Sequence, residues 1–164
     1  MSERAQELAV QFAQSSHAVI AFAEQCSVDD WRLITDEERW SVGVVCRHIA
    51  RGFEVHPQLV QQAATGQPMP TGYNWDAIHE SNANQAREWA GCTQQETLAL
   101  LHRYRSEAVA VVRGLSDEQL ERTVMPPLDN VRVSVQQIVE GMTDHPRAHL
   151  ASLRATVSRQ NVER

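Results

Sequence analysis

Apolar side chains recur at steps of three and four residues along most of the chain, and this spacing predicts helices rather than strands. The stripe includes Leu8, Phe12 and Val19 near the N-terminus, and Val135 and Met142 near the C-terminus. No segment shows the strict alternation that is typical of a half-buried strand. The pattern predicts helices over 3–25, 41–64, 75–90, 93–113 and 134–157, with a short turn of helix at 116–121.

Capping and breaking residues mark the ends of these helices. Capping boxes begin at Thr93, Ser116 and Ser134, each with a Glu or Gln three residues later. Glycines and prolines cluster at 65–72 and 126–127, where a helix is expected to stop. The helical segments are therefore well separated from one another.

Long amphipathic helices without strands predict an all-α fold, and their lengths favour a four-helix bundle. The connections at 65–74 and 114–133 are long enough to cross over one end of such a bundle. A chain of 164 residues is the size of one ordinary domain, so we expect a single bundle over residues 1–164.

Composition and charge narrow the functional classes. Fifteen basic residues, all of them Arg, stand against 21 acidic residues and leave a formal net charge of −6. This balance argues against nucleic acid and anionic membranes as partners, and favours a small-molecule substrate. The chain has no Lys, which excludes Schiff-base chemistry on a lysine of its own.

The number and spacing of the cysteines argue against two kinds of structure. Cys26, Cys46 and Cys92 are odd in number, widely spaced and without a CxxC pair. They indicate neither a disulfide framework nor a thiolate zinc site, which fits a reducing compartment. We find no basic and apolar leader and no apolar run of about 18 residues, so we expect a cytoplasmic protein.

His48, His145 and His149 are among the histidines that fall on apolar helix faces. At 100° per residue, His145 and His149 lie within about 60° of Met142, on the same face as Ile138. His48 lies within about 60° of Val45 on the second helix. A single histidine in such a place is more often a core residue than a ligand.

The pair of histidines on the last helix favours metal ligands over core residues. His145 and His149 are one turn apart, so both imidazoles can reach one metal ion. Three buried imidazoles without partners would be costly, and a divalent cation among them would satisfy all three. Pro146 lies between the two and is expected to kink the helix or restart it.

The other histidines divide into two groups. His17 and His102 lie away from the apolar stripes and are expected to face solvent. His56 shares the inward face of His48 but lies too far along the helix to share its metal, so it is interpreted as a structural residue or a pocket wall. A face of the segment 75–90 carries Trp75, His79 and Asn82, which are candidates for substrate binding or for supporting the metal ligands, against the alternative of simple buried hydrogen bonding.

Two motifs carry a resemblance that covers nearly the whole chain. Residues 40–50 (WSVGVVCRHIA) and 141–150 (GMTDHPRAHL), together with Trp31 and the stretch at 114–120 (GLSDEQL), resemble the DinB/YfiT-like superfamily. The resemblance implies a bundle with an up-down-down-up arrangement. It also implies a metal triad made of one His on the second helix and HxxxH on the last, which here would be His48 with the pair at 145 and 149.

The resemblance also suggests reactions. Some members are metal-dependent transferases that use thiols such as mycothiol or bacillithiol, with relatives of maleylpyruvate isomerase among them, and others are described as hydrolases. Our first hypothesis is a thiol-dependent S-transferase or isomerase, and the alternatives are a hydrolase that uses metal-bound hydroxide and a non-catalytic metal-binding or stress-related protein. Zinc is the first choice of ion, with nickel, iron or manganese open. An apolar bundle face would also be compatible with a homodimer.

Overall fold

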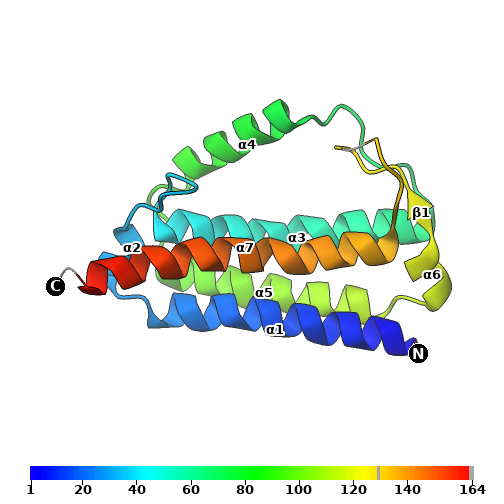
Figure 1. Cartoon of the computed structure of the whole chain (residues 1–164), viewed down its shortest axis with the longest axis horizontal. Helices are drawn as coiled ribbons and strands as arrows, with labels where there is room; N and C mark the ends of the chain where they lie inside the picture. The colour runs from blue at the N-terminus through cyan, green and yellow to red at the C-terminus, as the bar shows by residue number, and fades with distance from the viewer. Residues whose placement is uncertain (129, 163–164) are drawn as a thin grey trace.

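Four long helices form the body of the protein in the computed structural model, which describes residues 1–128 and 130–162. They are α1 (Glu3–Gln25), α3 (Val42–Thr65), α5 (Gln94–Arg113) and α7 (Val135–Val162), shown in Figure 1. α1 and α7 run in one direction and α3 and α5 in the other, so the order is up-down-down-up. The all-α four-helix bundle predicted from the sequence is confirmed.

Each long helix packs against two neighbours. α1 and α3 both contact α5 and α7, and so face each other diagonally across the core. Phe12 of α1 and Phe53 of α3 meet across that diagonal, with ring centroids 5.3 Å apart in an edge-to-face arrangement. The apolar stripes of the sequence therefore converge on one core, because each helix buries the face on which those residues recur.

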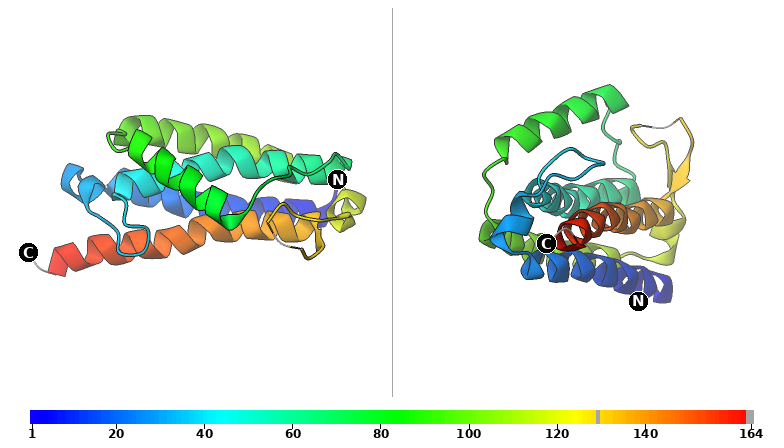
Figure 2. Two further views of the ribbon diagram at one scale, coloured as in Figure 1. Left: turned by 90° about the horizontal axis from the view of Figure 1, so that it is seen from above. Right: turned by 60° about the vertical axis from the view of Figure 1, so that its left-hand side comes forward.

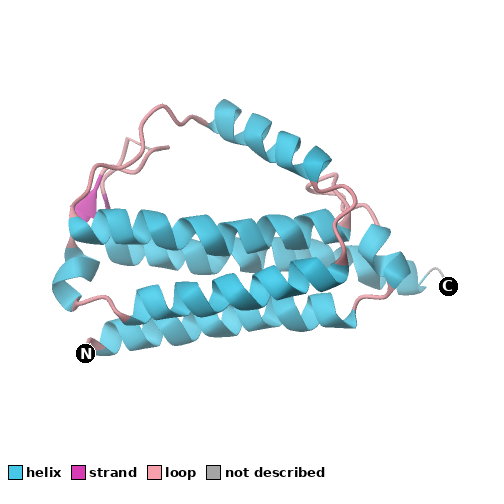
Figure 3. Cartoon of the chain, turned by 180° about the vertical axis from the view of Figure 1, so that it is seen from behind, coloured by secondary structure: helices cyan, strands magenta, loops and turns pink. Residues whose placement is uncertain are grey.

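Shorter elements close the ends of the bundle. α2 (Val28–Arg32) follows α1, and α6 (Asp117–Glu121) follows α5. β1 (Thr123–Val124) and β2 (Val133–Ser134) form an antiparallel pair at the end where α7 begins, as Figure 3 shows. The sequence predicted neither α2 nor the strands, because elements of two to five residues are too short for a period to show.

The prolines do not interrupt their helices. α3 continues through Pro57 and α7 through Pro146, so the restart that the sequence allowed at Pro146 does not occur. Proline lacks the N–H that would bind the carbonyl one turn earlier. Near this point the Ser15 hydroxyl of α1 donates to the carbonyl of Thr143 at 2.9 Å, which ties α7 to α1 one turn before the proline.

α4 (Trp75–Glu88) lies outside the bundle, on the side of α3 (Figures 1 and 2). None of its residues is buried, and its packing partner among the long helices is α3. Its helix begins at Asn74, whose side chain accepts a hydrogen bond from the N–H of Ala77. Across the described part of the chain, no helix combines the length and the apolar character that crossing a membrane requires.

Candidate metal centre

Three histidines from two helices meet beside the core. His48 comes from α3, and His145 and His149 come from α7, one helical turn apart. The Nε2 atoms of His48 and His145 are 3.2 Å apart, and each of the three residues offers a ring nitrogen within 4.8 Å of the other two. The helical period placed these side chains on inward faces, and the structure brings them together.

Burial keeps the imidazoles of His48 and His145 neutral. Desolvation, and after it the neighbouring histidines, lower the pKa of His48 to about 4. The same two causes lower the pKa of His145 to about 2. At neutral pH both rings therefore carry a free nitrogen lone pair, which is the form that binds a metal ion.

Glu38 is the residue that the sequence did not reveal. Its carboxylate lies 2.7 Å from Nδ1 of His149 and accepts a hydrogen bond from the Ser152 hydroxyl, also at 2.7 Å. The Glu38 side chain is 9% exposed. Its burial would raise its pKa, but hydrogen bonds from His149, Ser152 and Thr35 outweigh that effect and lower the pKa, so the group is ionised.

An ionised carboxylate beside Nδ1 determines which nitrogen of His149 carries the proton. The carboxylate only accepts, so Nδ1 of His149 is the donor, which leaves Nε2 as the ring nitrogen that could bind a metal ion. A carboxylate that holds a histidine in this way is a common support for a metal-binding imidazole.

The loop between α2 and α3 delivers Glu38 to this position. Arg39 adopts the left-handed conformation with φ at 61°, and the Thr35 N–H donates to the Trp40 carbonyl at 2.9 Å. This turn sends Glu38 toward His149, while the Trp40 ring packs edge-on against His48 with centroids 5.5 Å apart. Asp36, Glu37 and Glu38 follow one another in an irregular segment, so no periodicity could have shown which carboxylate reaches the site.

His56 lies next to the triad without belonging to it. Its ring contacts that of His145 edge-on, with centroids 5.0 Å apart, and burial lowers its pKa to about 4. It is absent from the set of mutually close ligand atoms found among the described residues. Gly52 makes room here, because a Cβ at that position would lie 3.1 Å from Nδ1 of His145. The role of His56 as a structural residue or a pocket wall stays a prediction.

The candidates on α4 lie apart from this cluster. Trp75 is 52% exposed and His79 is exposed, and their rings contact each other with centroids 6.0 Å apart. Asn82 is half-buried. The stripe that predicted an inward face is largely solvent-exposed because α4 stands away from the bundle, and the suggested role of these residues remains a prediction.

The cysteines are not placed to bind a metal. Cys26 and Cys46 are buried and Cys92 is half-buried. Burial is the largest cause that raises the pKa of each thiol, for Cys26 to about 11. Among the described residues, no cysteine belongs to a group that could hold a metal ion.

The histidine cluster fits a divalent cation. It supplies three nitrogen donors, and two of their rings are neutral because they are buried. The Nδ1 atom of His145 is buried without a hydrogen-bond partner among the described residues, so this ring gains little from its surroundings as a simple core residue. Three imidazoles without a thiolate or carboxylate are the donor set of an open, reactive metal site rather than of a closed structural one.

Comparisons with known proteins agree with the fold. YfiT from Bacillus subtilis, described as a probable metal-dependent hydrolase with an unusual four-helix bundle topology, superposes with a TM-score of 0.73 at 15% identity, over 98% of this chain and 90% of YfiT. The DinB-like protein YjoA from Bacillus subtilis superposes with a TM-score of 0.64 at 18% identity, over 94% and 92%. No curated protein matches the sequence. The model of the DinB superfamily matches residues 11–153, and the chain belongs to that superfamily.

Proposed function

We propose that this protein is an enzyme whose His48, His145 and His149 hold a divalent metal ion. The observation that carries the proposal is the convergence of three imidazoles, with the proton of one of them fixed by the buried carboxylate of Glu38. A cluster of core histidines would not need an ionised carboxylate among them, because burying a charge is costly.

A divalent ion on three neutral ligands keeps its full charge and acts as a Lewis acid toward a thiol or water molecule. The chain's own residues prepare for this chemistry. Glu38 holds the proton on Nδ1 of His149, and Trp40 covers one side of His48. Zinc is our first choice of ion because it accepts an all-imidazole site at low coordination number, and nickel, iron and manganese accept the same ligands.

Our first choice of reaction is transfer or isomerisation that depends on a small thiol. No described cysteine belongs to the histidine cluster, so sulfur at the metal would have to come from a separate molecule such as mycothiol or bacillithiol. A second candidate is hydrolysis, which is favoured by the likeness of the fold to that of YfiT, a probable metal-dependent hydrolase.

Metal analysis of the purified protein, followed by activity assays, tests the proposal. We expect close to one divalent ion per chain, loss of that ion in His48→Ala, and its retention in the control His17→Ala, whose side chain is exposed. A metal-free wild type that takes up no zinc, nickel, iron or manganese would refute the metal site. Turnover that requires added thiol supports transfer, and thiol-independent cleavage of an ester or amide supports hydrolysis.

A further inference from the structure

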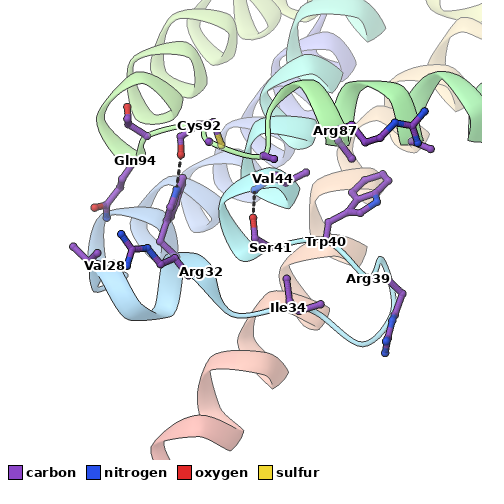
Figure 4. A pocket seen from close by; sticks show the side chains of 16 residues that line it. Val28, Arg32, Ile34, Arg39, Trp40, Ser41, Val44, Arg87, Cys92 and Gln94 are labelled. Carbon is purple, nitrogen blue, oxygen red and sulfur yellow. Dashed lines mark hydrogen bonds between the residues drawn. The ribbon is translucent and has the colours of Figure 1, made fainter.

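A cavity of about 870 Å³ lies beside the histidine cluster, where segment 28–44 meets segment 83–94 (Figure 4). Trp31, Val44 and Ala86 are among its apolar walls. Trp31 is held in place because its indole N–H donates to the Cys92 carbonyl at 3.0 Å. The volume is in the range that binds small organic molecules, about 300–1,000 Å³.

The charged side chains that line this cavity are all positive. Arg32, Arg39 and Arg87 contribute to the lining, and no acidic residue does. The chain as a whole carries a formal charge of −6, so this local excess of positive charge runs against the overall balance. All three arginines are solvent-exposed, and Figure 4 shows Arg32 on one side of the cavity and Arg39 and Arg87 on the other.

Nearby carboxylates face other partners. Asp36 pairs with Arg159, Glu38 is bound by His149, and the Glu96 carboxylate accepts a hydrogen bond from Thr93. The Arg87 guanidinium donates to the side-chain oxygen of Asn84 on its own helix, and the charge of Arg39 adds to the larger effect of Arg159 in lowering the pKa of Asp36. Because all three arginines are exposed, an anion from solvent can still reach their guanidinium groups.

One short stretch of the loop joins the cavity to the histidine cluster. Glu38 binds His149, Arg39 lines the cavity, and Trp40 both lines the cavity and packs against His48. A molecule in the cavity would thus lie against the same Trp40 ring that covers a proposed metal ligand.

We infer that the cavity binds a small organic carboxylate with an apolar or aromatic body. The exposed arginines on the side of Arg39 and Arg87 would bind the carboxylate, and the apolar walls would bind the body of the molecule. The inference that such a molecule is the substrate rests on the proposed metal enzyme, but its binding does not.

Calorimetric titration of metal-free protein with a matched pair of probes tests this site. 2-Naphthoate carries the carboxylate, and 2-naphthamide has nearly the same shape without the charge. We expect 2-naphthoate to bind about tenfold more tightly, as one or two charge-assisted hydrogen bonds would provide. The difference is expected to shrink as salt is added, because the arginines are exposed.

Two double variants of equal charge locate the effect. Arg39→Gln with Arg87→Gln is expected to bind both probes alike, while the control Arg103→Gln with Arg113→Gln, on α5 and away from the cavity lining, keeps the preference. Equal binding of both probes to the wild type, no saturable binding of either, or a preference that survives in the cavity variant would overturn the inference. An equal loss of the probe preference in both double variants would also overturn the inference, because the preference would then come from the overall charge of the protein.

The proposed metal site can fail without affecting this result. If His48→Ala retained all of its metal, the metal centre would be refuted while the probe preference stood. If the probes bound alike and His48→Ala lost its metal, the centre would stand and its substrate would enter elsewhere.

Discussion

A single carboxylate determines how one histidine of this site is used. His149 has two ring nitrogens, and Glu38 occupies one of them at 2.7 Å. Ser152 donates to the second carboxylate oxygen, so the carboxylate cannot rotate freely. The proton on Nδ1 and the orientation of the ring are thereby set before any ion binds.

Replacing Glu38 should therefore weaken metal binding without removing a ligand. We expect Glu38→Gln to raise the dissociation constant for zinc by about 10- to 100-fold, the usual effect of losing such a support. Competition with a chelator of known affinity measures this change. The neighbouring variant Glu37→Gln, at an exposed position, serves as the control, and equal affinities in both variants would contradict the role of Glu38.

The buried thiol of Cys26 is expected to make the protein less stable at alkaline pH. Burial, and then the charge of Asp30, raise its pKa from the ordinary 9.0 to about 11. Between these two pH values the unfolded chain loses the thiol proton while the folded protein keeps it, so the free energy of unfolding falls as the pH rises. The full free energy of unfolding is present below pH 9. Between pH 9 and about pH 11 it falls by about 1.4 kcal/mol for each pH unit because of this thiol.

Denaturant unfolding at a series of pH values tests this expectation. Cys26→Ser removes one of the three thiols whose pKa is raised, and should reduce the downward slope between pH 9 and 11. Below pH 9 the thiol is neutral in both states, so wild type and variant should have parallel curves there, which is an internal control. Identical slopes above pH 9 would show that the thiol does not limit stability.

At the scale of elements, two glycines in helices have opposite consequences. Gly43, in the first turn of α3, lies under the indole of Trp31, and a Cβ there would come closer than 3.0 Å to that ring. Trp31 in turn binds the Cys92 carbonyl, so α2, α3 and the segment before α5 meet at this point. Gly141, within α7, is exposed and has nothing within 4 Å of the same hypothetical atom.

We therefore expect Gly43→Ala to destabilise the protein by about 1–3 kcal/mol, because the indole must move and its hydrogen bond is strained. The matched substitution Gly141→Ala should stabilise it by about 0.5–1 kcal/mol, because alanine restricts the unfolded chain and fits the helix. Chemical denaturation of the two variants measures both changes. Equal signs for the two would contradict the packing described at Gly43.

Elements that repeat a period were predictable from the sequence, and elements without one were not. The capping box at Thr93 and the glycine at 66 mark helix ends that the structure shows, and the period of α7 placed His145 and His149 on the inward face. Glu38 was not predictable because its position depends on a left-handed turn at Arg39 and on contacts more than 100 residues away.

α4 shows a second limit of periodicity. Its stripe of Trp75, His79 and Asn82 has the spacing of a buried face, but burial depends on whether another element covers that face. The connections at either end of α4 hold it beside α3 rather than within the bundle. A pattern in one segment does not contain that information.

At the scale of the whole molecule, a metal ion at the proposed site would join α3, α7 and, through Glu38, the loop between α2 and α3. An ion that binds the folded protein alone raises the free energy of unfolding, by about 2.7 kcal/mol when its free concentration is 100 times the dissociation constant. We expect zinc to raise the thermal midpoint of metal-free protein accordingly.

Thermal unfolding with and without zinc checks this expectation. His149→Ala should lose the increase in midpoint, while His102→Ala, at an exposed position, should retain it. An increase of the same size in both variants would mean that zinc stabilises the protein from some other place.

The stretch from Glu38 to Trp40 touches both the histidine cluster and the cavity, and this continuity has a thermodynamic consequence. If an organic anion in the cavity changes the metal affinity by some factor, the metal must change the affinity for that anion by the same factor. The metal affinity measured with and without the anion, and the anion affinity measured with and without the metal, would test this equality. Three consecutive residues would then couple the two ligands.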